Sequence, residues 1–394
     1  MRQPVSDKFS GTLKLASRKN NKWDFKIKEM RLTISGTCPY SCLYCNLYFK
    51  KLYLAGKINY DELVAAYKVG NESADMLLDA NREDFSLEDY VFLFSCLKNN
   101  FGLEDVTLTG GDPFMNKNIQ EIARAAKAAE LRTTAITKGA PLFTCNNVAA
   151  INEKLKFIDR VIFSLDTMDK FSYAKNNLPL LNRSTALGYL TKTLRVIRLA
   201  VHSKTVVEVN CVAKPLRVKS DVGRQALVDY KKLIKFCLNN KIKKIKFIEL
   251  DSSKTLGKPF LNSFFDALDS FGCFCDYLNR RVKVVPDIDK NSCSVSKVCS
   301  LKRLRHPALD IYAYRTHCPA TFISLMTGRK QKGCEFKNGG ELHLDFYGNS
   351  LLCQRQINAQ KINLLKSVKS RNSESLTKEV LKINEMITRQ KCNF

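Results

Sequence analysis

The fold of this chain is restricted most by a repeated alternation of short apolar runs with helix-like segments between residues 30 and 250. The apolar runs, which we expect to be β-strands, are residues 30–34, 106–109, 132–137, 160–165, 205–212 and 242–250. Between them apolar residues recur at helical spacing, and the expected helices are residues 60–68, 87–97, 118–129, 147–155, 185–202 and 225–240. Strands that alternate with helices form a parallel sheet with the helices outside it. We therefore predict an α/β fold, a partial (β/α)6 TIM-like barrel with its chemistry at the carboxyl ends of the strands.

Three of the cysteines lie close together after the first expected strand, in residues 38–45, CPYSCLYC. Thiols this dense, in a chain without a secretory signal, indicate a metal rather than disulfides. Three thiolates on one loop can hold three irons of a [4Fe–4S] cluster and leave the fourth iron open to a ligand. A structural zinc site matches less well, because zinc takes four ligands and the chain has no second Cys-x-x-Cys.

The spacing of Cys38, Cys42 and Cys45, with the aromatic Tyr44 before the last of them, resembles that of the radical S-adenosylmethionine (SAM) enzymes. The resemblance implies that the three cysteines hold a [4Fe–4S] cluster whose fourth iron binds SAM, with Tyr44 beside the cofactor. It also implies that reductive cleavage of SAM gives a 5′-deoxyadenosyl radical, which abstracts hydrogen from a substrate. Such an enzyme would be an oxidoreductase or an isomerase.

Candidate SAM-binding residues lie at the ends of the later strands. Gly110 and Gly111 follow the second strand, and glycine lets the backbone come close to a ligand. In the resembled family this turn reads Gly-Gly-Glu-Pro and contacts the SAM amino group, and Asp112 stands here in place of the Glu. The candidates at the ends of the third to sixth strands are Thr137, Ser164, Asn210 and Glu249. The family places a Ser against SAM at the position of Ser164, whereas Asn210 and Glu249 are open between SAM, substrate and a structural role.

Within the superfamily, the barrel is most similar to the GTP 3′,8-cyclases of molybdenum cofactor biosynthesis. The matching segments are residues 31–34, 108–111, 164–167, 209–212 and 246–249, with a short C-terminal piece, residues 341–353. Of the basic residues that bind the triphosphate in those cyclases, only Arg31 is kept. The other positions hold Thr107, Glu208, Glu341 and His343. Carboxylates in place of cations would disfavour a triphosphate by roughly several kcal/mol, so we predict that the chain is not a GTP cyclase.

The C-terminal region has cysteines of its own around a predicted β-hairpin over residues 342–352. This arrangement resembles the auxiliary-cluster hairpin of the SPASM/twitch branch and implies a second [4Fe–4S] cluster. Its candidate ligands are Cys318, Cys334, Cys353 and Cys392. The alternative is that these are free cysteines packed as small apolar residues. The expected parts of the chain are residues 1–28 (N-terminal extension), 29–255 (barrel), 256–316 (connecting region) and 317–394 (twitch-like auxiliary cluster region).

Composition limits the partners of the chain. No apolar run is long enough to span a membrane and the N-terminus has no signal core, so we expect a soluble, cytoplasmic protein without membrane contact. The formal net charge of +27 favours anionic partners, among them RNA, an acidic peptide or a flavodoxin/ferredoxin-type electron donor. The lysines are scattered and no arginine-rich arm is present, so nucleic acid is not favoured.

Three functions are compatible with these features. The preferred one is a twitch-type radical SAM enzyme that acts on a peptide or natural-product substrate by epimerisation, dehydrogenation or cross-linking. The alternative is a nucleotide- or RNA-modifying radical SAM enzyme, and the third is a non-enzymatic iron–sulfur or zinc scaffold. The sequence does not select the substrate.

Overall fold

The computed structural model describes most of the expected barrel and several shorter segments after it. The described residues are 26–63 except 44 and 46, then 85–213, 221–249, 285–287, 302–306, 309–314, 340–344, 349–351 and 362–389. Within these ranges, no helix is long and apolar enough to cross a membrane.

The predicted parallel sheet is present, and its first six strands follow one another in chain order. These strands are β1 (Ile27–Ser35), β2 (Asp105–Gly110), β3 (Arg132–Thr137), β4 (Arg160–Ser164), β5 (Val206–Ala213) and β6 (Lys244–Glu249). Each pairs in parallel with the next. The order is the one that successive right-handed strand–helix units produce, and it confirms the α/β prediction.

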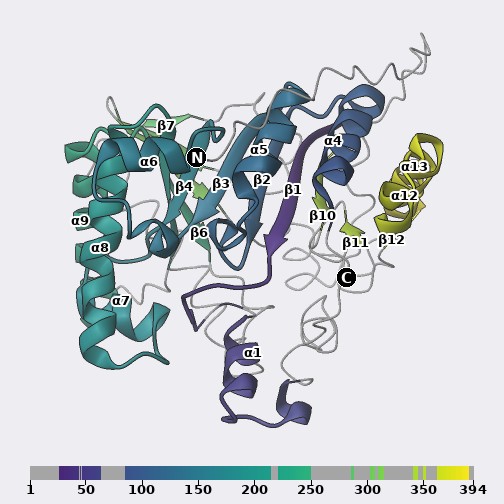
Figure 1. Ribbon diagram of the computed structural model, residues 1–394. Helices are drawn as coiled ribbons and strands as arrows, with labels where there is room; N and C mark the ends of the chain where they lie inside the picture. The colour runs from purple at the N-terminus through teal and green to yellow at the C-terminus, as the bar shows by residue number, and fades with distance from the viewer. Residues whose placement is uncertain are drawn as a thin grey trace, which may run out of the picture.

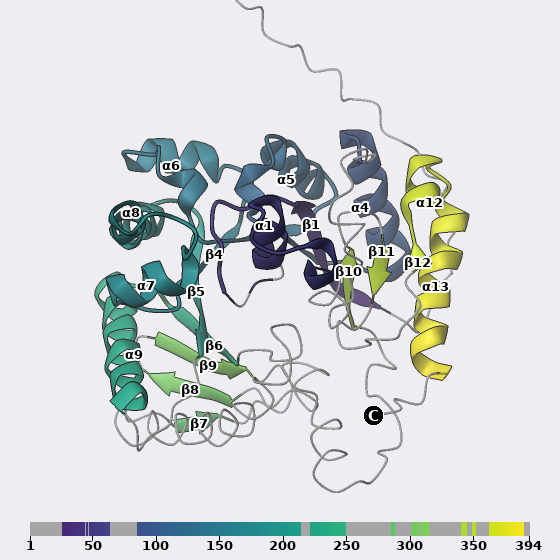
Figure 2. The same cartoon turned by 90° about the horizontal axis from the view of Figure 1, so that it is seen from below.

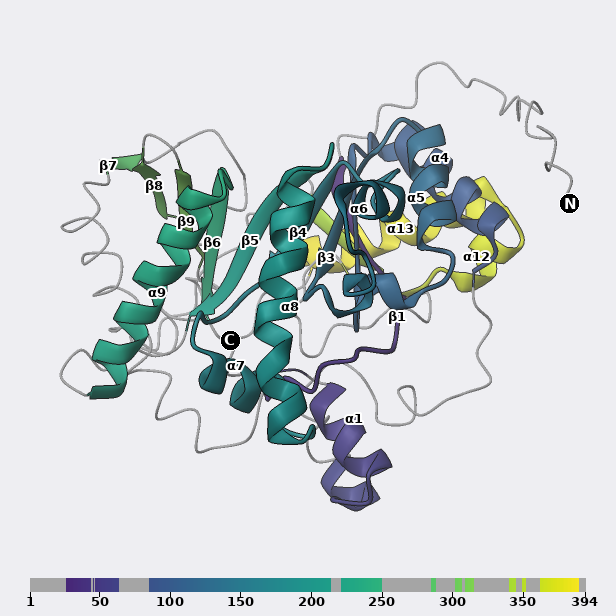
Figure 3. The ribbon, with the colours of Figure 1, turned by 60° about the vertical axis from the view of Figure 1, so that its left-hand side comes forward.

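The helices cover the outer face of this curved sheet (Figures 1 and 2). They are α4 (Leu87–Phe101), α5 (Ile119–Ala128), α6 (Val148–Lys154), α7 (Lys170–Asn177), α8 (Arg183–Val201) and α9 (Asp221–Asn239). A further helix, α1 (Leu47–Leu54), and α7 lie at the end of the molecule where the strands finish (Figure 3). Neither α1 nor α7 was expected from the sequence. Two 3₁₀ turns, η1 (Pro113–Met115) and η2 (Ala140–Leu142), follow β2 and β3.

Alternation along the strands separates an apolar outer face from a polar inner face. In β1, Met30, Leu32 and Ile34 are fully buried, whereas Glu29 and Arg31 are half-buried on the opposite side. The outer-face residues of the other strands join the same hydrophobic core beneath the helices. Both faces of a parallel sheet in a barrel are covered, so polar residues on the inner face are unusual. They make the inner face a candidate for a functional role.

Local sequence signals set the ends of the helices. Ser86 and Asp89 form a capping box at the start of α4, with hydrogen bonds of 3.2 Å and 2.8 Å between each side chain and the backbone N–H of the other residue. Gly102, with φ 70°, ends the helix in the left-handed conformation that glycine adopts at low cost. Asn147, Asp169 and Asn182 cap α6, α7 and α8 in the same side-chain-to-backbone manner.

Two groups of later strands extend the barrel sheet at its edges. The predicted C-terminal hairpin consists of β10 (Gly340–Leu344) and β11 (Asn349–Leu351), and β10 pairs in parallel with β1. At the other edge β9 (Leu309–Tyr314) pairs in parallel with β6. The remaining strands are β7 (Val285–Asp287), β8 (Lys302–His306) and β12 (Ile362–Asn363). Neither β8 nor β9 was predicted. In β8, four of the five residues are basic and give no hydrophobic period.

The last helices pack on the outside of the barrel. They are the short α12 (Leu365–Lys369) and the longer α13 (Ser373–Arg389). Asn100 of α4 donates to Thr377 over 3.0 Å, and the ammonium of Lys369 lies 3.3 Å from the Asp89 carboxylate. These contacts fix the C-terminal helices to α4, beside β1.

Candidate active site at the carboxyl ends of the strands

The loop after β1 carries the three closely spaced cysteines, and we call residues 38–45 the cysteine loop. Cys42 is buried, whereas Cys38 and Cys45 are half-buried and none of the three is in a disulfide. The backbone N–H of Cys45 donates to the carbonyl of Cys42 over 3.0 Å, which closes a turn between the last two cysteines. Tyr44 lies outside the described residues.

The chemistry of this donor set fits an iron–sulfur cluster. Burial raises the pKa of Cys38 and of Cys42 to about 12, so both thiols stay protonated at neutral pH unless a cation replaces the proton. In the described part of the chain, no three His, Cys, Asp or Glu side chains are placed to hold one metal ion. A cubane cluster does not need that placement, because each cysteine binds a different iron.

Residues of two helices form hydrogen bonds with the backbone of the cysteine loop. At the end of α7, the carbonyls of Asn176 and Asn177 accept hydrogen bonds from the N–H groups of Leu43 and Ser41, over 3.0 Å and 2.9 Å. From α1, the Lys51 ammonium donates to the carbonyls of Cys38 and Tyr40, each over 2.6 Å. These hydrogen bonds to its backbone give the cysteine loop a defined shape.

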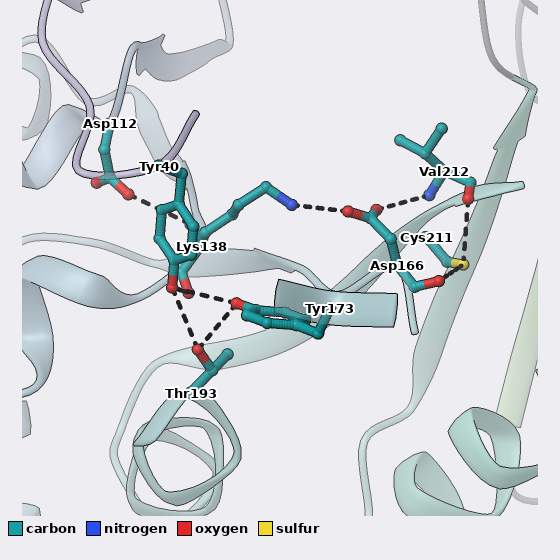
Figure 4. A network of polar contacts seen from close by, with 8 residues as sticks. All are labelled: Tyr40, Asp112, Lys138, Asp166, Tyr173, Thr193, Cys211 and Val212. Carbon is teal, nitrogen blue, oxygen red and sulfur yellow. Dashed lines mark hydrogen bonds and ion pairs between the residues drawn. The ribbon is translucent and has the colours of Figure 1, made fainter. Parts of the chain in front are cut away.

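Tyr40, between the first two cysteines, is buried and anchors the loop through its side chain (Figure 4). Its hydroxyl lies 3.1 Å from the hydroxyl of Tyr173 and 3.3 Å from that of Thr193, which are themselves 3.1 Å apart. It also donates to the carbonyl of Lys138 over 3.2 Å. We call Tyr40, Tyr173 and Thr193 the hydroxyl cluster. The cluster was not predicted, because the three residues lie on separate segments without a shared motif.

A buried ion pair links the ends of three strands next to this cluster (Figure 4). The ammonium of Lys138, after β3, lies 2.7 Å from a carboxylate oxygen of Asp166, after β4. The other oxygen of Asp166 accepts from the N–H of Val212 in β5 over 3.0 Å. Burial alone would lower the pKa of Lys138, but the Asp166 carboxylate holds that pKa above its ordinary value. The pair therefore stays charged and fixes the strand ends to one another.

The two glycines after β2 allow the chain to pass directly against the segment that leads into the cysteine loop. The N–H of Gly111 donates to the carbonyl of Ser35 over 2.7 Å, and that of Asp112 to the carbonyl of Thr37 over 2.8 Å. A Cβ on Gly110 or Gly111 would lie 2.2 Å or 2.1 Å from those same carbonyl oxygens. The two amides are thus bound within the protein, and a contact between this turn and SAM stays a prediction.

Asp112 and Thr137, both candidate SAM-binding residues, are joined by a hydrogen bond between their side chains. The buried carboxylate of Asp112 accepts from the Thr137 hydroxyl over 2.7 Å, and from the N–H groups of Phe114 and Lys138 over 3.1 Å and 3.3 Å. Burial raises the pKa of Asp112 to about 6, against the opposing effect of these donors. The observed contacts give both side chains a structural role in joining β2 to β3.

Ser164, the last residue of β4, pairs with Asn210, which lies within β5 and three residues before its end. The Oδ1 atom of Asn210 is buried and has no hydrogen-bond partner, which makes it available to a ligand. Glu249 is the last residue of β6, and its side chain lies outside what the structure describes. The four C-terminal cysteine candidates, Cys318, Cys334, Cys353 and Cys392, also lie outside the described residues.

The inner face of the sheet carries charged residues that the sequence analysis did not bring together. Glu208 of β5 is buried, and one of its oxygens lies 3.6 Å from the guanidinium of Arg160 in β4 and 3.2 Å from the ammonium of Lys244 in β6. Nearby, the Thr107 hydroxyl donates to Glu29 over 2.8 Å. A possible signal was the polar residue at every second position of otherwise apolar strands.

Comparison with known proteins finds a family model that matches the first part of the barrel. Residues 32–215 match the family model of the radical SAM superfamily. The chain is 23% identical over 202 residues to a "Probable GTP 3′,8-cyclase" of Methanocaldococcus jannaschii. This match covers 50% of this chain and 54% of that protein. It is 22% identical over 224 residues to a protein of the same name from Saccharolobus islandicus, which covers 57% of each. The chain thus spans little more than half the length of these curated relatives.

Solved structures with a similar fold cover more of the chain. SuiB of Streptococcus suis bound to S-adenosylmethionine gives a TM-score of 0.51 at 16% identity, over 87% of this chain and 64% of SuiB. SuiB bound to its precursor peptide SuiA gives 0.53 at 15% identity, over 90% of this chain and 65% of SuiB. At this identity the likeness concerns the fold.

Proposed function

We propose that this chain, a radical SAM enzyme by the match of residues 32–215 to that superfamily, abstracts hydrogen from a peptide or peptide-derived natural product. Cys38, Cys42 and Cys45 would hold the [4Fe–4S] cluster, which together with SAM supplies a 5′-deoxyadenosyl radical. The outcome would be epimerisation, dehydrogenation or cross-linking of the substrate.

The residues of the chain prepare this site in distinct ways. The hydroxyl cluster, and the hydrogen bonds that α1 and α7 make to the backbone of the cysteine loop, keep this loop in one shape before the cofactor binds. In our proposal Tyr44, the Gly110–Asp112 turn, Thr137 and Ser164 lie around SAM. Asn210 and Glu249 serve SAM or the substrate.

The observation that carries the choice of substrate is the charge balance of the inner face. Arg160 and Lys244 both lie beside one buried carboxylate, that of Glu208. A triphosphate needs several cations that are not already compensated. Because Glu208 already engages Arg160 and Lys244, these two cations are less available to a triphosphate, which favours a substrate with little charge, such as a peptide. The likeness to SuiB, a protein that binds a precursor peptide, supports the same choice at the level of the fold.

We further propose an auxiliary [4Fe–4S] cluster in the C-terminal region, with Cys318, Cys334, Cys353 and Cys392 as its ligands. The support is the sequence pattern together with the hairpin of β10 and β11, which forms where it was predicted. A flavodoxin or ferredoxin would be the electron donor, because such proteins are acidic and this chain is strongly basic.

A nucleotide-modifying reaction is the second candidate function. It is favoured by the names of the curated relatives, which describe GTP 3′,8-cyclases, and by the net charge of +27. Uncompensated phosphate-binding cations would have to come from residues outside the inner-face set described above.

The test is a reaction with anaerobically reconstituted protein, SAM and dithionite, run in parallel with GTP and with synthetic peptides encoded by short reading frames beside the gene. We expect 5′-deoxyadenosine in amounts that match a change in mass or stereochemistry of one peptide. The triple variant Cys38→Ala/Cys42→Ala/Cys45→Ala should form neither product. Stoichiometric conversion of GTP, or SAM cleavage that leaves every peptide unaltered, would contradict the peptide proposal.

A further inference from the structure

Lys246 is a cation on the inner face of the sheet that has no ion-pair partner among the residues that the structure describes. It lies in the middle of β6, opposite Asn210 of β5 and Tyr312 of β9. Its side chain is half-buried. Among the described residues its ammonium makes no hydrogen bond or ion pair, whereas the neighbouring Arg160 and Lys244 both lie within 4 Å of Glu208.

The electrostatic surroundings of Lys246 are unfavourable for its charge. Burial lowers the pKa of Lys246, and the positive charge of Lys244 lowers it further, against weaker support from Glu208 and Glu29. An anion bound beside Lys246 would replace the lost hydration and offset the repulsion from Lys244.

An unpartnered acceptor lies on the adjacent strand in the same row. Asn210, which pairs with Lys246 in the sheet register, has a buried Oδ1 without a hydrogen-bond donor. Two neighbouring strands thus offer a ligand one cation and one acceptor. A main-chain N–H next to an acidic side chain satisfies both.

We propose that the inner face between β5 and β6 binds an acidic residue of the peptide substrate, with its carboxylate at Lys246 and its main-chain N–H at Asn210. This inference rests on the proposed peptide substrate and makes Lys246 a specificity-determining residue. The one ammonium of Lys246 suits one carboxylate and not a chain of phosphates.

The experiment is affinity selection of short random synthetic peptides on the reconstituted holoenzyme with SAM, with the retained peptides read by mass spectrometry. Wild-type protein should enrich Asp or Glu at one position by about tenfold, the factor expected for a charge-assisted hydrogen bond. Lys246→Met, which keeps the aliphatic stem, should bring this enrichment back to the input level. Lys246→Arg should retain most of it.

The matched control is Lys243→Met, because Lys243 is an exposed lysine just before the same strand. Its peptide selection should equal that of the wild type, and the iron content of every variant should confirm an intact fold. Peptides retained without acidic preference, or with the same preference in Lys246→Met, overturn this inference but leave the peptide proposal in place. Retention of no peptide by the wild type overturns both.

Discussion

At the scale of single residues, the cysteine loop depends on Tyr40 as well as on its thiols. Tyr40→Phe removes one hydroxyl from the hydroxyl cluster, while Tyr173 and Thr193 keep their mutual 3.1 Å contact. The free energy of unfolding should fall by about 1 kcal/mol, with iron content close to that of the wild type. Tyr40→Ala also opens a cavity, which should cost about 3 kcal/mol or more and reduce iron retention. Urea unfolding of the apoprotein and iron per chain after desalting measure both effects.

The control for Tyr40 is its ring neighbour Tyr189, whose centroid lies 5.7 Å away and whose hydroxyl makes no hydrogen bond within the described part of the chain. Tyr189→Phe should therefore change neither quantity. If Tyr40→Ala held iron as well as the wild type does, the hydroxyl cluster would not be an anchor of the loop.

At the scale of elements, the turn after β2 sets the path of the cysteine loop. Gly111→Ala places a Cβ 2.1 Å from the backbone oxygen of Thr37, next to Cys38, so the loop has to move. We expect much lower iron content and loss of SAM cleavage. Gly188→Ala in α8 is the matched change, because nothing lies within 4 Å of its Cβ position, and it should leave iron unchanged and stabilise the helix by up to about 1 kcal/mol. Equal iron in the two variants would show that the close approach is not required.

The elements also show how far the sequence could be interpreted. The six barrel strands were predicted because apolar runs bounded by turns are a local signal, and the glycine pair was identified as a close approach. The partner of that approach was not identified, since Ser35 and Thr37 meet the glycines only after β1 and β2 pair. Likewise, Arg160, Glu208 and Lys244 come together only through the register in which three strands pair. That register cannot be read from a single sequence.

At the scale of the whole molecule, the barrel sheet continues from β1, the strand before the cysteine loop, into the C-terminal hairpin. β10 runs parallel to β1, and β11 returns antiparallel, with Leu351 opposite His343. The chain therefore enters and leaves this hairpin at the same end, with Cys334 and Cys353 flanking it in sequence. That topology suits two cysteines that share one cluster, separate from the one on the cysteine loop.

Counting iron tests this two-cluster arrangement. Anaerobically reconstituted wild type should hold about eight irons per chain, and both Cys38→Ala/Cys42→Ala/Cys45→Ala and Cys334→Ala/Cys353→Ala should hold about four. Only the second variant should still bind SAM, because our proposal assigns the open iron to the cysteine loop. Cys237→Ala is the control. Cys237 lies on α9 and is buried in the hydrophobic core, so its loss should not affect either cluster. About four irons in the wild type and none in the first variant would leave one cluster and contradict the auxiliary site.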